Sequence, residues 1–148
     1  MDRLEVPLAD YNDDLIHWIE QQVSLLRVRD FKHLDVEHLI EGFEEMVGRN
    51  QRELCSRLHV LIMHLLKCQY QPRRKSTSWL ATINEQRRAI ARLLERSPSL
   101  SSAVERMARQ EYAHAVRSAV IETRLPKSAF PPEPPFTPAQ LHDDDFVP

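Results

Sequence analysis

The sequence predicts an all-α protein, an irregular bundle of about four main helices followed by a proline-rich C-terminal tail. Apolar residues recur every three or four positions over long stretches, which is the period of an amphipathic helix. Only Gly42 and Gly48 are glycine among 148 residues, too few for the tight turns of a β-rich fold. Seven of the ten prolines lie from Pro126 onward, and the other three fall where the helical pattern breaks. We therefore expect a helical domain over residues 1–126, with residues 127–148 as a tail packed on it.

The first two helices are predicted from their capping residues. We expect the first to begin near Asp10, with Asp13 and Asp14 in its first turn, because acidic side chains there meet free amides and the helix dipole. Its apolar positions are Leu15, Trp18, Ile19, Val23 and Leu26. The second helix is expected to begin at Asp35, as an N-cap, and to run as far as Gln71.

One apolar seam follows the whole of the second predicted helix. It consists of Leu39, Phe43, Met46, Leu54, Leu58, Leu61, Leu65 and Cys68. Gly48 and Asn50 are the places where we expect a bend, because an interior glycine costs about 1 kcal/mol relative to alanine. A helix this long in a small protein often packs against another helix or a second chain.

The rest of the chain is divided by its prolines. A loop at residues 72–76 is expected to end in serines that cap a third helix. The apolar positions of this helix are Trp79, Ile83, Ile90, Leu93 and Leu94. Ser97 and Pro98 are expected to open a fourth helix that runs to Leu125, because serine favours the N-cap and proline the first helical position. Thr137 and Pro138 predict one short turn before the acidic residues 143–145.

Charge is segregated along the chain. Residues 1–45 carry twelve acidic and four basic side chains, and residues 46–127 carry six acidic and sixteen basic ones. Residues 128–148 carry four acidic side chains and no lysine or arginine. The acidic ends can therefore pair with the basic middle, or either kind of segment can attract a partner of opposite charge.

Composition disfavours several classes of protein. With so little glycine the chain has no P-loop and no dinucleotide-binding turn. No apolar run approaches the roughly 20 residues of a membrane span, and the first residues lack the basic-then-apolar pattern of a signal peptide. Cys55 and Cys68 are too few for a disulfide framework. We therefore expect a cytoplasmic protein with no membrane partner and no cofactor.

Short motifs along the chain resemble a known family. They are the run from Tyr11 through Trp18 to Leu25-Leu26-Arg27, Leu34-Asp35 with Leu39-Ile40-Glu41, His64-Leu65-Leu66-Lys67 with Gln69-Tyr70-Gln71-Pro72, Ser78-Trp79, Gln86-Arg87, Ser97-Pro98-Ser99-Leu100 and Asp145-Phe146-Val147-Pro148. Together they resemble a bacterial family known only as domain of unknown function number twenty-nine. The resemblance spans nearly the whole chain, implies a bacterial, all-helical protein, and names no activity. The chain departs from the family's pattern at Gly42, Phe43 and Val47.

A polar cluster on the second helix is one candidate binding site. His64, Lys67 and Gln71 are three and four residues apart and therefore share one helix face. A tryptophan and an arginine of the third helix can reach that face if the two helices are antiparallel, and two glutamates lie earlier on the second helix. The candidate ligand-binding cluster is Glu41, Glu44, His64, Lys67, Gln71, Trp79 and Arg87. The alternative is a hydrogen-bonded network that fixes helix packing.

Two patterns of metal-ligand spacing are present but incomplete. The acid-x-x-His pairs are Asp35–His38 and Glu111–His114, and the cysteine–histidine pairs are Cys55–His59 and His64–Cys68. Helical di-metal sites need two Glu-x-x-His pairs and two further glutamates. The two cysteine–histidine pairs lie about 13 Å apart along a helix and on opposite faces, too far apart for one zinc ion. We therefore predict no metal site.

Basic residues around the third helix are a second candidate surface. They are Arg73, Arg74, Lys75, Arg88, Arg92 and Arg96. Such a set could contact nucleic acid or an acidic partner, although the sequence pI of about 6.4 is low for a dedicated nucleic-acid binder. The alternative is a solvated face that meets the acidic N-terminal segment.

The sequence favours an interaction protein over an enzyme. No serine or cysteine lies in a recognisable nucleophile motif. We predict a module that binds another protein or forms a homodimer. One alternative is a nucleic-acid-associated protein that uses the basic helix face. The other is a metal-assisted hydrolytic enzyme centred on Glu41, Glu44, His64 and Lys67.

Overall fold

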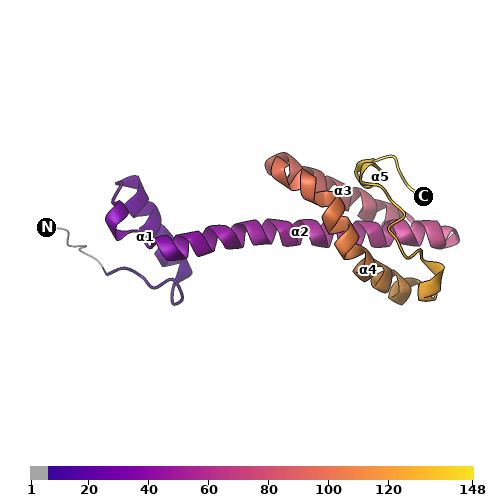
Figure 1. The fold of residues 1–148 in the computed structure, drawn as a ribbon, viewed down its shortest axis with the longest axis horizontal. Coiled ribbons are helices and arrows are strands. Elements are labelled where there is room, and N and C mark those ends of the chain that lie inside the picture. Colours follow the sequence, from indigo (N-terminus) through magenta and orange to yellow (C-terminus); the bar gives the residue numbers. More distant parts are fainter. Residues whose placement is uncertain (1–6) are drawn as a thin grey trace. The chain divides into compact units, whose positions relative to one another are not determined.

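The computed structural model describes residues 7–148 and confirms the all-α prediction. Its α-helices are α1 (Leu15–Arg27), α2 (Val36–Tyr70), α3 (Thr77–Arg96), α4 (Val104–Thr123) and the short α5 (Pro138–His142), labelled in Figure 1. Short 3-10 turns occupy Phe31–His33, Pro72–Arg74, Pro98–Ala103 and Lys127–Ala129. No strand occurs within the described residues. None of the helices in this part of the chain has both the length and the apolar character that a membrane span requires.

The chain divides into two compact units, which are described separately. Unit 1 comprises Met1–Val47 and unit 2 comprises Gly48–Pro148. Residues of α2 remain α-helical through Gly48 and Asn50, where the sequence suggested a bend. The expected division into residues 1–126 and a tail remains a prediction.

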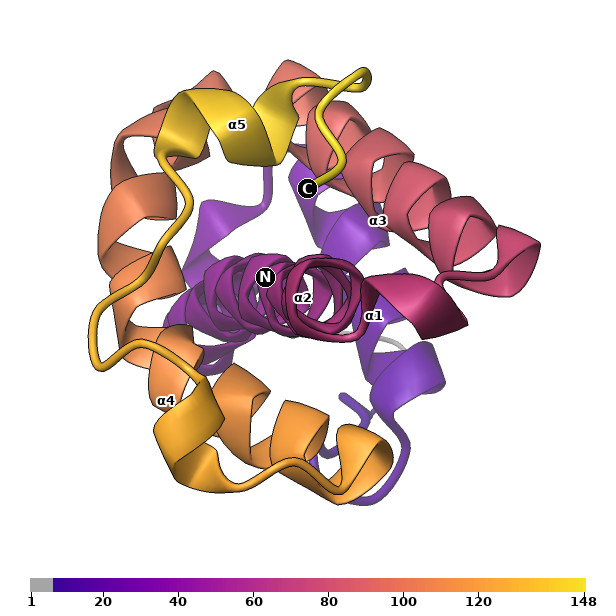
Figure 2. The ribbon, with the colours of Figure 1, turned by 90° about the vertical axis from the view of Figure 1, so that its right-hand side faces the viewer.

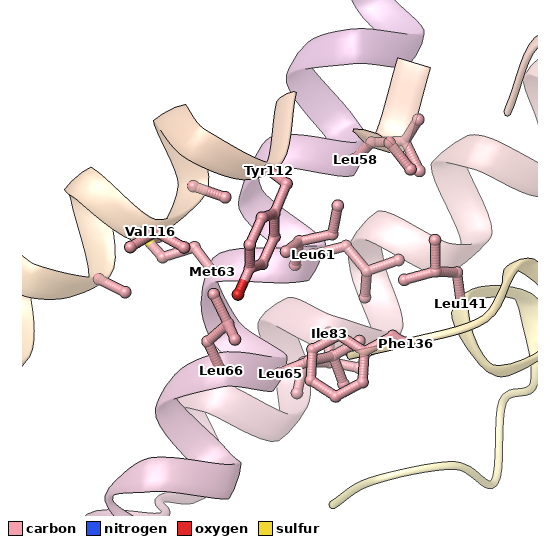
Figure 3. Packing of buried hydrophobic residues seen from close by; sticks show 14 of the residues in the cluster. Leu58, Leu61, Met63, Leu65, Leu66, Ile83, Tyr112, Val116, Phe136 and Leu141 are labelled. Carbon is pink, nitrogen blue, oxygen red and sulfur yellow. The ribbon is translucent and has the colours of Figure 1, made fainter. Parts of the chain in front are cut away.

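In unit 2, the second part of α2 packs between α3 and α4, and the tail returns along α4 to α5 (Figure 2). The buried residues of the predicted seam are Leu54, Leu58, Leu61, Leu65 and Cys68. They meet Ile83 of α3, Tyr112 and Val116 of α4, and Phe136 and Leu141 of the tail (Figure 3). Each fully buried large apolar side chain stabilises this core by about 1.5–3 kcal/mol.

The tail is fixed to unit 2 by buried rings and by local capping. Phe130 and Phe136 belong to the core, and the Tyr112 hydroxyl donates to the Pro131 carbonyl oxygen at 2.6 Å. Burial raises the pKa of Tyr112 to about 12. Thr137 caps α5 in a reciprocal capping box with Gln140, which confirms the predicted turn.

Two predicted helix starts are wrong. The first helix begins at Leu15 rather than near Asp10, because the Asp10 carbonyl accepts from the amides of Asp13 and Asp14 in a turn. Asp14 is then the N-cap and accepts from the His17 amide.

The fourth helix is also shorter than predicted. Pro98–Ala103 is a 3-10 segment in which the Ser102 hydroxyl donates to the Ser99 carbonyl, the kind of local bond with which serine competes against the α-helix. At the other end, Pro126 disfavours helical geometry at the residue before it. The helix accordingly ends at Thr123, and Arg124 adopts a left-handed conformation with φ of 60°.

Unit 1 has little interior. Among its described residues only Trp18, Gln22 and Leu25, all on α1, are buried. Asp35 precedes α2 as predicted, and its carboxylate accepts from the His38 amide at 3.4 Å. The order of unit 1 therefore depends on a small set of contacts between α1 and the start of α2.

Candidate functional site

Lys67 is a buried cation held between an acid and an aromatic ring. Its Nζ donates to Oε2 of Glu122 at 2.5 Å and lies 4.4 Å from the centre of the Trp79 ring. These contacts offset the cost of removing an ammonium group from water. The structure thus brings Lys67 and Trp79 together as the sequence suggested. The Glu122 partner was missed, because it lies 55 residues away on α4 and no local pattern marks it.

His64 of α2 and Gln71, the residue that follows α2, bind to backbone atoms. Nδ1 of His64 lies 2.9 Å from the Val60 carbonyl oxygen, and burial lowers the pKa of His64. Nε2 of Gln71 donates to the Thr123 carbonyl at 3.0 Å. Gln71 therefore ties the end of α2 to the end of α4.

Arg87 binds the tail. Its Nε donates to the Leu141 carbonyl and its Nη2 to the Gln140 carbonyl, both at 3.0 Å. Burial lowers the pKa of Arg87, while Asp144 and Asp143 act in the opposite direction. The role of this residue in the structure is to anchor α5 on α3.

The five members of the predicted ligand-binding cluster that lie in unit 2 form a packing network. They are His64, Lys67, Gln71, Trp79 and Arg87. Within the described residues, no buried side-chain nitrogen or oxygen lacks a hydrogen-bond partner. Glu41 and Glu44, the two remaining members of the predicted cluster, lie in unit 1 and are exposed on α2.

The predicted basic surface is exposed to solvent. Arg73, Arg74 and Lys75 follow α2, while Arg88, Arg92 and Arg96 recur every four residues on α3. Nζ of Lys75 donates to the Pro148 carbonyl oxygen at 2.7 Å, so this lysine also holds the end of the tail.

Unit 1 contains a hydrogen-bonded centre that sequence reasoning did not assemble. Oδ2 of Asp35 accepts from Nε1 of Trp18 at 3.0 Å and lies 2.7 Å from Nδ1 of His38. The Asp35 amide donates to Oε1 of Gln22 at 2.9 Å, which explains why this glutamine is buried. Tyr11 stacks on His38, with ring centroids 4.5 Å apart. The sequence had marked Asp35 and His38 only by their acid-x-x-His spacing, as a possible metal-ligand pattern.

The charges of this centre stabilise one another. Burial acts to raise the pKa of Asp35, but hydrogen bonds from His38 and Trp18 outweigh it and hold that pKa below its ordinary value. The hydrogen bond with Asp35 raises the pKa of His38, and Glu41 and Asp10 act in the same direction. The Asp35–His38 pair therefore lies at the start of α2, and the hydrogen bonds of Asp35 with Trp18 and Gln22 join α1 to α2.

Apolar side chains of unit 1 face solvent on both of its helices. The α1 apolar stripe comprises Leu15, Ile16, Ile19, Val23 and Leu26. The α2 apolar stripe comprises Val36, Leu39, Ile40, Phe43, Met46 and Val47. Except for the half-buried Leu39, each residue of the two stripes is between 40% and 66% exposed. The apolar seam that the sequence predicts along α2 is therefore exposed at Phe43 and Met46, whereas its members from Leu54 onward are buried in unit 2.

Two further features of the described residues bear on ligand binding. Within residues 7–148, no three histidine, cysteine, aspartate or glutamate side chains are grouped so that they could hold a metal ion. A pocket of about 350 Å³ lies where the proline-rich segment crosses α4, lined by Glu105, Arg109, Glu133 and Phe136 among others. Arg109 and Glu105 pair with each other at 3.2 Å.

The comparisons with known proteins give a family and no activity. The model of the family described as domain of unknown function DUF29 matches residues 11–147. Neither a curated protein nor a solved structure matches the chain significantly.

Proposed function

The chain belongs to the DUF29 family, and we propose that it is a protein-interaction module in which unit 1 docks on another protein. The family description names no activity, so the proposal comes from the surface of the molecule. Unit 2 supplies a folded helical core, and unit 1 supplies the docking element.

One observation carries the proposal, namely where the exposed large apolar residues lie. The described residues include fifteen such side chains, and thirteen of them belong to unit 1. The two in unit 2 are Leu80 and Ile121. Single apolar residues on a surface are ordinary, but a concentration of this kind marks an interaction site.

The size of unit 1 supports the same conclusion. It has 47 residues and only three buried side chains among those described. Chains below about 40–60 residues bury too little surface to be firmly stable without a disulfide, a metal or a partner. The contacts that stabilise unit 1 are therefore completed by another protein.

Site-specific photo-crosslinking in living cells of the bacterial host tests this proposal. A photo-reactive phenylalanine analogue replaces Phe43 in one variant and Ile121 of unit 2, which is 72% exposed, in a matched control. We expect a discrete protein adduct from position 43 and none from position 121. Equal adducts from both positions, or none from position 43, would contradict the proposal.

The exposed basic residues of unit 2 favour a second candidate function, association with nucleic acid. Arg88, Arg92 and Arg96 form one exposed row on α3, and such a row can contact phosphates. This function predicts that replacing the three arginines by alanine weakens binding to DNA or RNA and reduces its dependence on salt. Unchanged affinity would rule it out.

The proposal includes a cytoplasmic location in a bacterium. Its support is that Cys55 and Cys68 are both free thiols, which is usual in a reducing compartment. Burial, the largest effect at each, raises the pKa of both thiols, so neither has the character of a reactive cysteine.

A further inference from the structure

The α2 apolar stripe has the geometry of a helix-binding face. At about 100° per residue, its six side chains fall within an arc of about 120° over twelve residues. Val36, Ile40, Phe43 and Val47 alternate spacings of four and three, which is the pattern of a seam between two helices. A partner helix can therefore pack along it.

The two edges of the stripe differ. On one side α1 is held against the start of α2 by the hydrogen bonds of Trp18 and Gln22 with Asp35. On the other side Glu37, Glu41 and Glu44 follow the stripe at spacings of four and three, and all three are exposed. An occupant of this stripe therefore meets a row of carboxylates along its free edge.

The exposed apolar area of the α2 stripe suits a contact with a single helix. Its five exposed side chains present roughly 500 Å², if a large apolar residue has an accessible area of about 180 Å². The largest apolar patch on an ordinary monomer is about 300–600 Å² and is often functional. A standard interface buries about 800 Å² on each partner, so polar residues at the edges of the stripe contribute the remainder.

Charge decides between the possible occupants. Residues 1–47 carry twelve acidic and four basic side chains, so two copies of unit 1 placed face to face repel each other. Unit 2 of a second copy is basic, but Leu80 and Ile121 are its only exposed large apolar residues, too few to cover the stripe. A partner that carries both an apolar stripe and basic flanks satisfies both requirements.

We infer that the α2 stripe binds an amphipathic helix of another protein, one whose apolar stripe is flanked by lysine or arginine. This inference rests on the proposed function and specifies its partner. Apolar residues of that helix pack on Ile40 and Phe43, and its basic residues pair with Glu37, Glu41 and Glu44.

Designed peptides of about 18 residues test the inference on the full chain. The first peptide has a leucine stripe flanked by lysines on an alanine background, and the second has glutamate at every lysine position. The third has the composition of the first in scrambled order. Binding of each labelled peptide is followed by fluorescence anisotropy at low and at high salt.

We expect the lysine-flanked peptide to bind about tenfold or more tightly than the glutamate-flanked one, because three exposed charge pairs together amount to roughly that factor. The scrambled peptide should bind weakly, and the difference should shrink at high salt. Changing Glu37, Glu41 and Glu44 together to glutamine should remove the preference for lysine. Phe43→Asp and Ile40→Asp alter exposed residues and should abolish binding, whereas Ile121→Asp should not.

The other outcomes separate this inference from the proposed function. Equal binding of the lysine-flanked and glutamate-flanked peptides would overturn the inference of a basic partner and would leave the proposed docking function of unit 1 intact. If the scrambled peptide binds as tightly as the lysine-flanked one, binding depends on net charge and not on an apolar helix face, and the inference is overturned. If no peptide binds and sedimentation shows a dimer that Phe43→Asp dissociates, the occupant is a second copy. If no peptide binds, the chain is monomeric and Phe43 gives no crosslink, both the inference and the proposed function fail.

Discussion

Arg87 allows a quantitative test of how the tail is held. In Arg87→Met the side chain keeps most of its apolar length and loses the two hydrogen bonds to the carbonyls of Gln140 and Leu141. A hydrogen bond from a charged donor contributes about 1.5–3 kcal/mol, and relief of the burial of the guanidinium offsets part of that loss. We therefore expect the free energy of unfolding of unit 2 to fall by about 3 kcal/mol.

The assay is urea unfolding followed by far-UV circular dichroism, with Arg88→Met as the matched control. Arg88 is the next residue on α3 and is exposed, so its substitution should change the stability by less than about 0.5 kcal/mol. By heat, Arg87→Met should lower Tm by about 15 °C. A loss below about 1 kcal/mol, or one equal to that of Arg88→Met, would show that Arg87 does not anchor the tail.

The remaining predictions concern the titratable groups. Glu122→Ala should destabilise unit 2 by about 2 kcal/mol because it leaves a buried Lys67 ammonium without its counter-ion, whereas Lys67→Met should cost less than about 1 kcal/mol; equal losses in urea unfolding would contradict this. NMR titration should give His38 a pKa above 6.5. Because the pKa is raised in the folded state, the contribution of His38 to the stability of unit 1 should be full below pH 6.5 and should be lost as the pH rises through the raised pKa. An unshifted pKa of His38 would refute the pair with Asp35. Cys68, which is fully buried, should react with a thiol reagent only on unfolding, while the half-buried Cys55 should react sooner; rapid labelling of Cys68 in the native protein would contradict the packing.

Three of the helix starts were predictable from the side chain that caps them, although the start of α1 at Asp14 was not. Asp35, Ser76 and Thr137 each accept a hydrogen bond from an amide three residues on, and each marks the start of a predicted element. Asp10 also has the chemistry of a cap, but its carbonyl and carboxylate are used in a turn. Capping preference alone does not distinguish these two uses of an aspartate.

The partners of the polar residues were not predictable. Periodicity placed Lys67 on the correct face of α2, yet its counter-ion is 55 residues away. Arg87 binds carbonyls in the tail, and a backbone acceptor leaves no mark in the sequence. Such pairings depend on how helices pack against one another, which a single sequence does not encode locally.

The apolar seam of α2 shows a further limit of periodicity. The predicted seam runs from Leu39 to Cys68, but it is buried from Leu54 onward and exposed at Phe43 and Met46. The spacing predicts that a face will be covered and does not say by which chain. The docking surface therefore became visible only when the exposure of each residue was known.

Amide hydrogen exchange across α1 tests the central claim most directly. It is measured on the full chain alone at low concentration, and again with the lysine-flanked peptide at saturation. If unit 1 needs a partner, amides of α1 exchange far faster than those of α3 in the protein alone, and slow down when the peptide is bound. Slow exchange of α1 in the dilute protein, equal to that of α3, would show that unit 1 is stable by itself and would contradict the account.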